Sequence, residues 1–150
     1  MLPWFRIGAL LGGLAVAFGA FAAHGLDDFF AKKYRDVAPK KTAGFEVPAS
    51  WKYLQDFKTG AEYQMYHSLA LLAVGLAAAR ATRRRALDLA GWCFLLGIVL
   101  FSGSLYALTL TGATYWVFVT PIGGTLFLVG WGALVFAAID QLRGNNAPHI

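Results

Sequence analysis

Cysteine and charge are both scarce in this sequence. Its one cysteine, Cys93, excludes an intramolecular disulfide framework, because a disulfide needs two cysteines. Only 14% of the 150 residues are charged and 58% are apolar, whereas about 25% of residues are charged in a typical soluble domain. The composition therefore excludes an ordinary soluble protein and predicts a protein that lies in a membrane.

Catalytic motifs are also missing. The chain has no phosphate-binding P-loop, no G-x-S-x-G nucleophile motif, no H-E-x-x-H zinc motif and no C-x-x-C pair. Two histidines, His24 and His67, are expected on adjacent helices, and two imidazoles are too few for a convincing haem or metal site. We therefore expect a protein that is not an enzyme and that holds no cofactor or metal.

Four apolar blocks are each long enough to cross a bilayer, which takes about 20 residues of helix. The predicted fold is all-α, an integral membrane bundle of four transmembrane helices in a single domain. A long hydrophilic loop, residues 26–58, is expected between helices one and two. The four helices are predicted at residues 4–24, 60–79, 87–110 and 121–139.

The first apolar block also resembles a cleavable signal peptide. It begins with the short basic stretch MLPWFR, and AFAA is similar to a cleavage site made of small residues. Its apolar run from Ile7 to Ala23, however, has 17 residues, more than the usual ~7–15 of a signal peptide. We therefore expect an uncleaved first helix.

Local signals place the ends of the second and fourth helices. Thr59 and Glu62 form the pattern T-x-x-E, which predicts a capping box at the start of helix two. Thr120 followed by Pro121 predicts an N-cap at the start of helix four. The segments 27–37 and 50–58 have apolar residues at spacings of three or four, which is typical of short amphipathic helices on a membrane surface. A flexible charged loop is the alternative for this region.

Basic residues flank the apolar blocks, so the net charge of +5 is better explained by membrane topology than by a nucleic-acid partner. With four spans, six basic residues lie on the side of the termini and seven on the side of the long loop. Four of the six, Arg80 and Arg83 to Arg85, gather in one short turn, and the positive-inside rule gives short turns the most weight. We predict that both termini are cytoplasmic in a bacterial inner membrane.

Polar residues within the predicted spans gather at one depth, on the long-loop side. On helix two, Gln64 and His67 share a face with Gly75 at 100° per residue, and on helix three Ser102 and Tyr106 share another. Such faces should point into the bundle, because a polar side chain is costly in hydrocarbon without a partner. For His67 we expect a hydrogen bond to Ser102, Tyr106 or Gln64. The ligand-binding candidates are His24, Gln64, His67, Ser102, Tyr106 and Thr120.

Four stretches give the chain a recognisable pattern. They are GGLAVAFGAFAAHGL, TGAEYQMYHSLALL, GWCFLLGIVLFSGSLYALTLTG and TPIGGTLFLVGWGAL, one for each predicted span. The chain resembles, in these stretches, the small four-helix membrane family known as domain of unknown function 423, related to the transmembrane protein 256 group. The resemblance implies a bacterial cytoplasmic membrane and a retained first helix, and it carries no activity. The long loop looks like an expansion relative to that family.

Two functions remain open. The first is a non-enzymatic accessory, assembly or structural membrane subunit, alone, as a homo-oligomer or with another membrane protein. The spacing of Gly8 and Gly12, G-x-x-x-G, favours such helix packing. The alternative is a binding protein for a lipophilic small molecule, a quinone or a lipid, in the polar cluster around His24 and His67. Under either hypothesis, the protein is embedded in the lipid bilayer.

Overall fold

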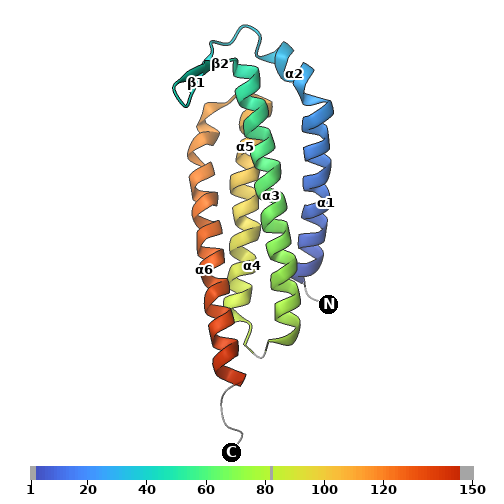
Figure 1. Ribbon diagram of the computed structural model, residues 1–150, viewed down its shortest axis with the longest axis vertical. Coiled ribbons are helices and arrows are strands. Elements are labelled where there is room, and N and C mark those ends of the chain that lie inside the picture. The colour runs from blue at the N-terminus through green and yellow to red at the C-terminus, as the bar shows by residue number, and fades with distance from the viewer. Residues whose placement is uncertain (1–2, 82, 146–150) are drawn as a thin grey trace, which may run out of the picture.

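The computed structural model describes residues 3–81 and 83–145, with side chains up to residue 139. Four long helical rods lie side by side (Figure 1). They are α1 (Pro3–His24), α3 (Ala49–Arg80), the rod of α4 (Arg85–Gly97), π-helix η1 (Ile98–Ser102) and α5 (Gly103–Thr111), and α6 (Thr120–Asn145). The prediction of an all-α fold is confirmed.

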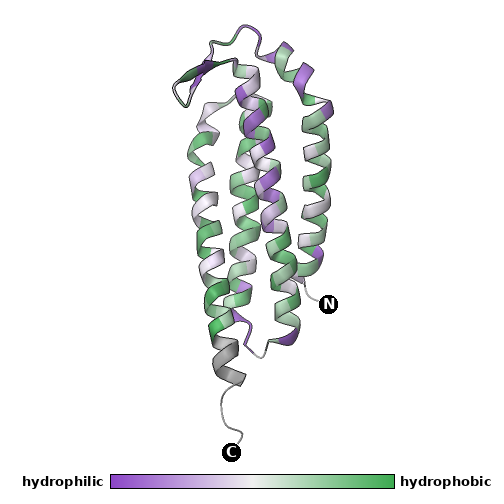
Figure 2. Cartoon of the chain, in the orientation of Figure 1, coloured by the Kyte–Doolittle hydropathy of each residue, from purple (hydrophilic) through white to green (hydrophobic). Residues whose placement is uncertain are grey.

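Three segments of the described chain are long and apolar enough to cross a membrane: Pro3–His24, Arg85–Thr111 and Thr114–Ile139. Helix α3 is not among them. Hydrophilic residues colour both ends of the bundle and also the upper half of α3 (Figure 2). The polar residues that open the predicted second span lower its hydropathy, so whether α3 crosses the membrane depends on where those residues point.

The predicted capping box at Thr59 and Glu62 is wrong. Helix α3 begins at Ala49, directly after Pro48, so both residues lie inside a continuous helix. Burial explains the earlier start: Tyr53, Leu54 and Phe57 are at most 7% exposed. Their spacing of three and four residues forms an apolar stripe that packs on the bundle. The helix therefore takes in the last ten residues of the predicted hydrophilic loop, 49–58.

The rest of the region between the first two rods is also structured. It holds α2 (Leu26–Lys33) and a hairpin of β1 (Lys40–Thr42) with β2 (Phe45–Val47), in which Lys40 pairs with Val47. The turn of the hairpin uses two residues of positive φ, Ala43 and Gly44. The first part of the amphipathic segment 27–37 is therefore helical, as expected. The hairpin was not predicted from the sequence.

Helix α2 is held on the end of α5 by two hydrogen bonds. The Tyr34 hydroxyl donates to the Thr109 carbonyl oxygen at 2.6 Å, and Lys33 Nζ donates to the Leu110 carbonyl oxygen at 2.7 Å. These bonds satisfy carbonyl groups that a helix C-terminus leaves without partners. Burial, with a smaller contribution from Tyr53, raises the pKa of Tyr34 to about 12, so this hydroxyl remains a donor at physiological pH.

Helices α1 and α3 approach each other closely through two glycines. A Cβ atom on Gly8 would lie 2.8 Å from the Ser68 carbonyl oxygen, and one on Gly75 would lie 2.6 Å from the backbone nitrogen of Phe5. Both distances are too short for a methyl group. Gly8, one member of the predicted G-x-x-x-G pair, therefore packs against α3 of the same chain. It is buried there and does not lie on an outer face that a second copy could contact.

Gly8 gives the first testable prediction. Gly8→Ala should lower the free energy of unfolding by about 1–3 kcal/mol, because the new methyl group forces apart two backbones that cannot yield easily. The matched control is Gly13→Ala on the same helix, where no atom lies within 4 Å of the new Cβ. This control should be neutral or stabilising by up to about 1 kcal/mol. Thermal unfolding in detergent measures both, and equal unfolding temperatures would contradict the packing described.

Candidate functional site

Gln64 connects three rods. This residue of α3 is 3% exposed. Its amide nitrogen donates to the Leu11 carbonyl oxygen of α1 at 2.8 Å. Its amide oxygen accepts a hydrogen bond from the Tyr106 hydroxyl of α5 at 3.0 Å. One side chain therefore ties α1 and α5 to α3.

His67, one turn further along α3, is 5% exposed and has a partner for each ring nitrogen. Nδ1 lies 2.8 Å from the Tyr63 carbonyl oxygen, and Nε2 accepts from Trp131 Nε1 of α6 at 3.3 Å. A carbonyl oxygen can only accept and an indole nitrogen can only donate, so this arrangement assigns the neutral tautomer with its proton on Nδ1. The predicted hydrogen bond of His67 to Ser102, Tyr106 or Gln64 is wrong. The Tyr106 hydroxyl donates to Gln64, and the Ser102 hydroxyl bonds to neither His67 nor Gln64.

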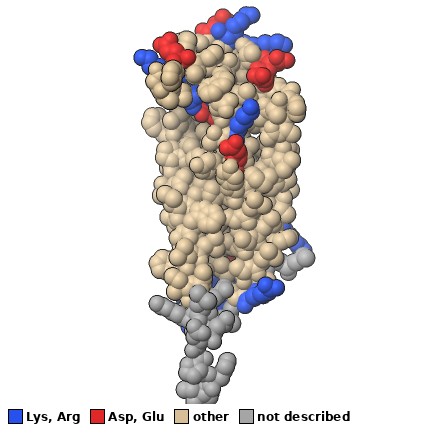
Figure 3. Space-filling view, in the orientation of Figure 1, with Lys and Arg blue, Asp and Glu red and all other residues tan. Residues whose placement is uncertain are grey.

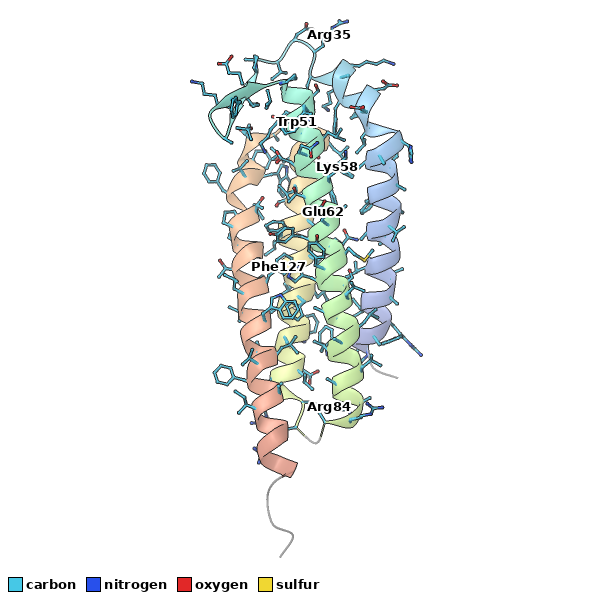
Figure 4. All side chains as sticks on the ribbon, viewed as in Figure 1. Arg35, Trp51, Lys58, Glu62, Arg84 and Phe127 are labelled. Atoms are coloured by element: carbon cyan, nitrogen blue, oxygen red, sulfur yellow. The ribbon has the colours of Figure 1, made fainter. Side chains whose placement is uncertain are left out.

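Aromatic rings enclose the His67 imidazole. It stacks on Phe127 of α6 with ring centroids 3.4 Å apart and planes 5° from parallel, and Phe94 of α4 lies 5.6 Å away. Figure 4 shows Phe127 at mid-height in the bundle, among the side chains between the rods. Both ring nitrogens of His67 therefore have partners within the protein, and Phe127 covers one face of the ring.

The remaining candidates do not join one cluster. Ser102 lies in η1, is fully buried, and its hydroxyl has no hydrogen-bond partner in the structure. Thr120 is the first residue of α6 rather than its N-cap, and its hydroxyl lies 2.8 Å from that of Ser104. This contact joins α5 to α6 on the hairpin side of the bundle.

His24 lies apart from the others. It is exposed at the C-terminal end of α1. Gln64 contacts α1 at Leu11, and His24 is 13 residues further along that helix, which corresponds to about 20 Å at 1.5 Å per residue. The prediction of one polar cluster around His24 and His67 is therefore wrong in its geometry, and ligand binding at the other residues stays a prediction. Within the described residues, no three His, Cys, Asp or Glu side chains come together as a metal site.

Three groups in these contacts escaped the sequence prediction: Trp131, Phe127 and the Leu11 carbonyl. Trp131 carried a usable signal. It lies in the middle of an apolar block, and the N–H group of a tryptophan at that depth needs an acceptor. A histidine on another span is a suitable acceptor. The Leu11 carbonyl carried no signal, since any backbone carbonyl next to a glycine-rich face could have taken that bond.

Comparison with known proteins places these residues in a family. Residues 18–124 match the model of the family described as "Protein of unknown function (DUF423)". A UPF0382 membrane protein of Haemophilus influenzae is 44% identical over 133 residues, which cover 89% of this chain and 90% of that protein. The UPF0382 membrane protein YwdK of Bacillus subtilis is 38% identical over 142 residues, 95% of this chain and 100% of that protein.

A third relative adds a location. The UPF0382 inner membrane protein YgdD of Escherichia coli is 42% identical over 142 residues, which cover 94% of this chain and 92% of that protein. No solved structure matches the chain. The comparisons thus agree on a membrane protein and supply no activity.

The Gln64 bridge gives the second testable prediction. Gln64→Leu should lower the free energy of unfolding by about 1–2 kcal/mol, since it removes two interhelical hydrogen bonds of the size measured in membrane bundles. Tyr66→Phe, at a position 55% exposed on the same helix, is the matched control and should leave the free energy of unfolding unchanged. Chemical unfolding in detergent distinguishes them, and a stable Gln64→Leu protein would show that the bridge is dispensable.

Proposed function

Since the chain belongs to the family described as "Protein of unknown function (DUF423)", whose relatives are named membrane proteins, we propose that it is a non-enzymatic accessory subunit of the bacterial inner membrane. In this role it assists the assembly or stability of other copies or other membrane proteins. The observation that carries the proposal is the closed interior. Gln64 and His67 use their polar atoms on other helices and on their own backbone, so the protein acts through its outer surface.

The proposal takes α3 as a fourth transmembrane helix. Its polar residues Gln64, His67 and Ser68 are at most 5% exposed, so they do not meet lipid. The exposed residues in the same stretch include Leu69 and Leu76, at 54% and 60%. Residues 61–80 would span about 30 Å, the thickness of the hydrocarbon core. Part of the low hydropathy of α3 therefore comes from its inner face, and the exposed charged residues of this stretch, Glu62 and Arg80, lie near its two ends.

The orientation follows from the arginine turn. The connection from α3 to α4 lies at the same end of the bundle as the start of α1 and the end of α6 (Figure 1). It carries Arg80 and Arg83 to Arg85, and clustered arginines near short turns favour the cytoplasmic side. Charged side chains gather at both ends of the molecule, with a broad uncharged belt between them (Figure 3). We therefore orient both termini toward the cytoplasm and the hairpin away from it.

Cysteine labelling tests this orientation. In a Cys93→Ala background, Lys41→Cys in the hairpin should react with a membrane-impermeant maleimide in intact spheroplasts. Arg84→Cys in the turn should react only after permeabilisation, and both positions are exposed. Labelling of Arg84→Cys from outside would reverse the orientation. If both positions were labelled from the same side, α3 would not cross the membrane.

Site-specific photo-crosslinking in cells tests the accessory role. A photo-reactive residue is placed at one exposed position on each of three helices, Leu10, Leu76 or Phe136, which are 67%, 60% and 72% exposed. A subunit should give a protein adduct of defined mass at one of these faces and lipid adducts at the others. Lipid adducts at all three positions, together with a monomer by mass measurement in mild detergent, would contradict the proposal.

A further inference from the structure

The hairpin of β1 and β2 ends in an apolar tip, residues 43–45. Its two turn residues, Ala43 and Gly44, have φ angles of 50° and 85°, as the tight turns that fit the twist of a hairpin require. Asparagine, aspartate and glycine are the usual residues there, and an alanine with positive φ is uncommon. Phe45 follows directly and is 74% exposed. The tip therefore presents a methyl group and a phenyl ring, without the polar side chain that such turns usually carry.

Strand pairing shows on which face of the hairpin Phe45 lies. Side chains alternate between the two faces of a strand, and paired residues share a face. In the register of β1 with β2, the half-buried residues that share a face with Phe45 are Lys40, Thr42 and Val47. Lys40 Nζ lies 5.7 Å from the centre of the buried Tyr53 ring of α3. This face therefore lies against the bundle, and at its far end the Phe45 ring extends beyond the protein.

The tip lies at the height at which α6 begins. In Figure 1 the hairpin stands to the side of the upper end of α3, and its turn reaches the edge of the molecule level with the first turn of α6. Residues 120–139 hold no charged residue and would span about 30 Å, the thickness of the hydrocarbon core. The first turn of α6, and with it the tip, is therefore placed at the boundary between acyl chains and headgroups. This step rests on the embedded bundle of the proposed function, in either orientation.

A second segment exposes aromatic rings at this height. The short helix η2 (Thr114–Phe118) directly precedes α6, and its residues Tyr115 and Phe118 are 63% and 79% exposed. Aromatic side chains gather at the boundary between lipid and water, where an apolar ring meets acyl chains. Two segments far apart in the sequence thus present exposed rings at one level of the bundle.

We propose that the hairpin tip inserts into the lipid leaflet on its side of the membrane, with the Phe45 ring among the upper parts of the acyl chains. The backbone of the tip stays at the level of the headgroups, because hydrocarbon would leave its polar groups without partners. Lipid is the occupant that an embedded bundle meets at this height. The chemistry recognised is therefore the apolar boundary of the leaflet, without a choice of headgroup.

The opposite face of the hairpin limits how deep the tip goes. Lys41 and Glu46 are paired across the two strands and are both exposed. A deeper position would carry these charges into hydrocarbon, which is costly, and a shallower one would return the Phe45 ring to water. The hairpin thereby holds the end of the bundle at one depth in the leaflet.

A nitroxide label tests the insertion. In a Cys93→Ala background, Phe45→Cys is spin-labelled, and the full chain is reconstituted into vesicles of phosphatidylethanolamine and phosphatidylglycerol. Collisions with oxygen, which concentrates among acyl chains, are compared with collisions with a water-soluble nickel complex. We expect oxygen to relax the label at position 45 more strongly than nickel does. The matched control is Glu46→Cys, the adjacent exposed residue on the other face of the strand, where nickel should be the stronger of the two.

A second measurement keeps an aromatic ring at the tip. Benzoylphenylalanine in place of Phe45 should form phospholipid adducts on illumination of the same vesicles, and in place of Glu46 it should form far fewer. Stronger relaxation by nickel at both positions would overturn the proposal. So would equal lipid adducts at both positions, or an adduct of position 45 with a second copy of the chain, which would make the tip a protein contact.

The outcome for the tip is separable from that for the proposed function. Reversed cysteine labelling would move the tip to the other leaflet and leave the results expected at positions 45 and 46 unchanged. An embedded topology with a water-exposed tip refutes the insertion alone. Lipid adducts at Phe45 without a protein adduct on any helix face refute the accessory role alone.

Discussion

A polar group inside this bundle can find a hydrogen-bond partner only within the protein, because the hydrocarbon around it has no donors or acceptors. The Gln64 amide meets this constraint with one bond to a backbone carbonyl of α1 and one from a tyrosine of α5. His67 meets it with its own helix and the indole of Trp131 on α6. These two residues, one turn apart on α3, contact all the other rods. The polar start of the second apolar block is thus the part of the chain that fixes how the rods assemble.

Helix α3 can take this central place because its neighbours come close enough. The contact of Gly8 with the backbone at Ser68, and of Gly75 with the backbone at Phe5, brings α1 against α3 along much of their length. Small residues that let backbones approach are the usual means of helix packing in lipid, where there is no hydrophobic driving force between helices. The close approach also brings the Leu11 carbonyl within reach of the Gln64 amide. Packing and hydrogen bonding at this interface therefore depend on each other.

The sequence predicted the rods better than their contacts. The predicted starts at residues 4, 87 and 121 lie within two residues of the starts of α1, α4 and α6, whereas α6 continues to Asn145, six residues beyond the predicted end at 139. The capping box at Thr59 failed because burial of Tyr53, Leu54 and Phe57 carries α3 back to Ala49. The inward face of Gln64 and His67 was predicted from helical phase, whereas their partners depend on the rotation of other helices. A single sequence does not specify that rotation, so His24 was grouped with residues about 20 Å away.

A closed interior changes where function can lie. Two sets of polar residues occur on α3 at neighbouring depths: Gln64 and His67 face inward with partners, whereas Lys58 is half-buried and Glu62 is exposed. A buried polar group with its partner in place stabilises a fold, and a charged side chain near the end of a span can keep its charged group in water. The same helix thus turns partnered polar side chains toward the interior and the charged Glu62 toward the surface. Under the proposed function, partners are therefore to be sought on the outer surface of the bundle rather than around the histidine that stands out in the sequence.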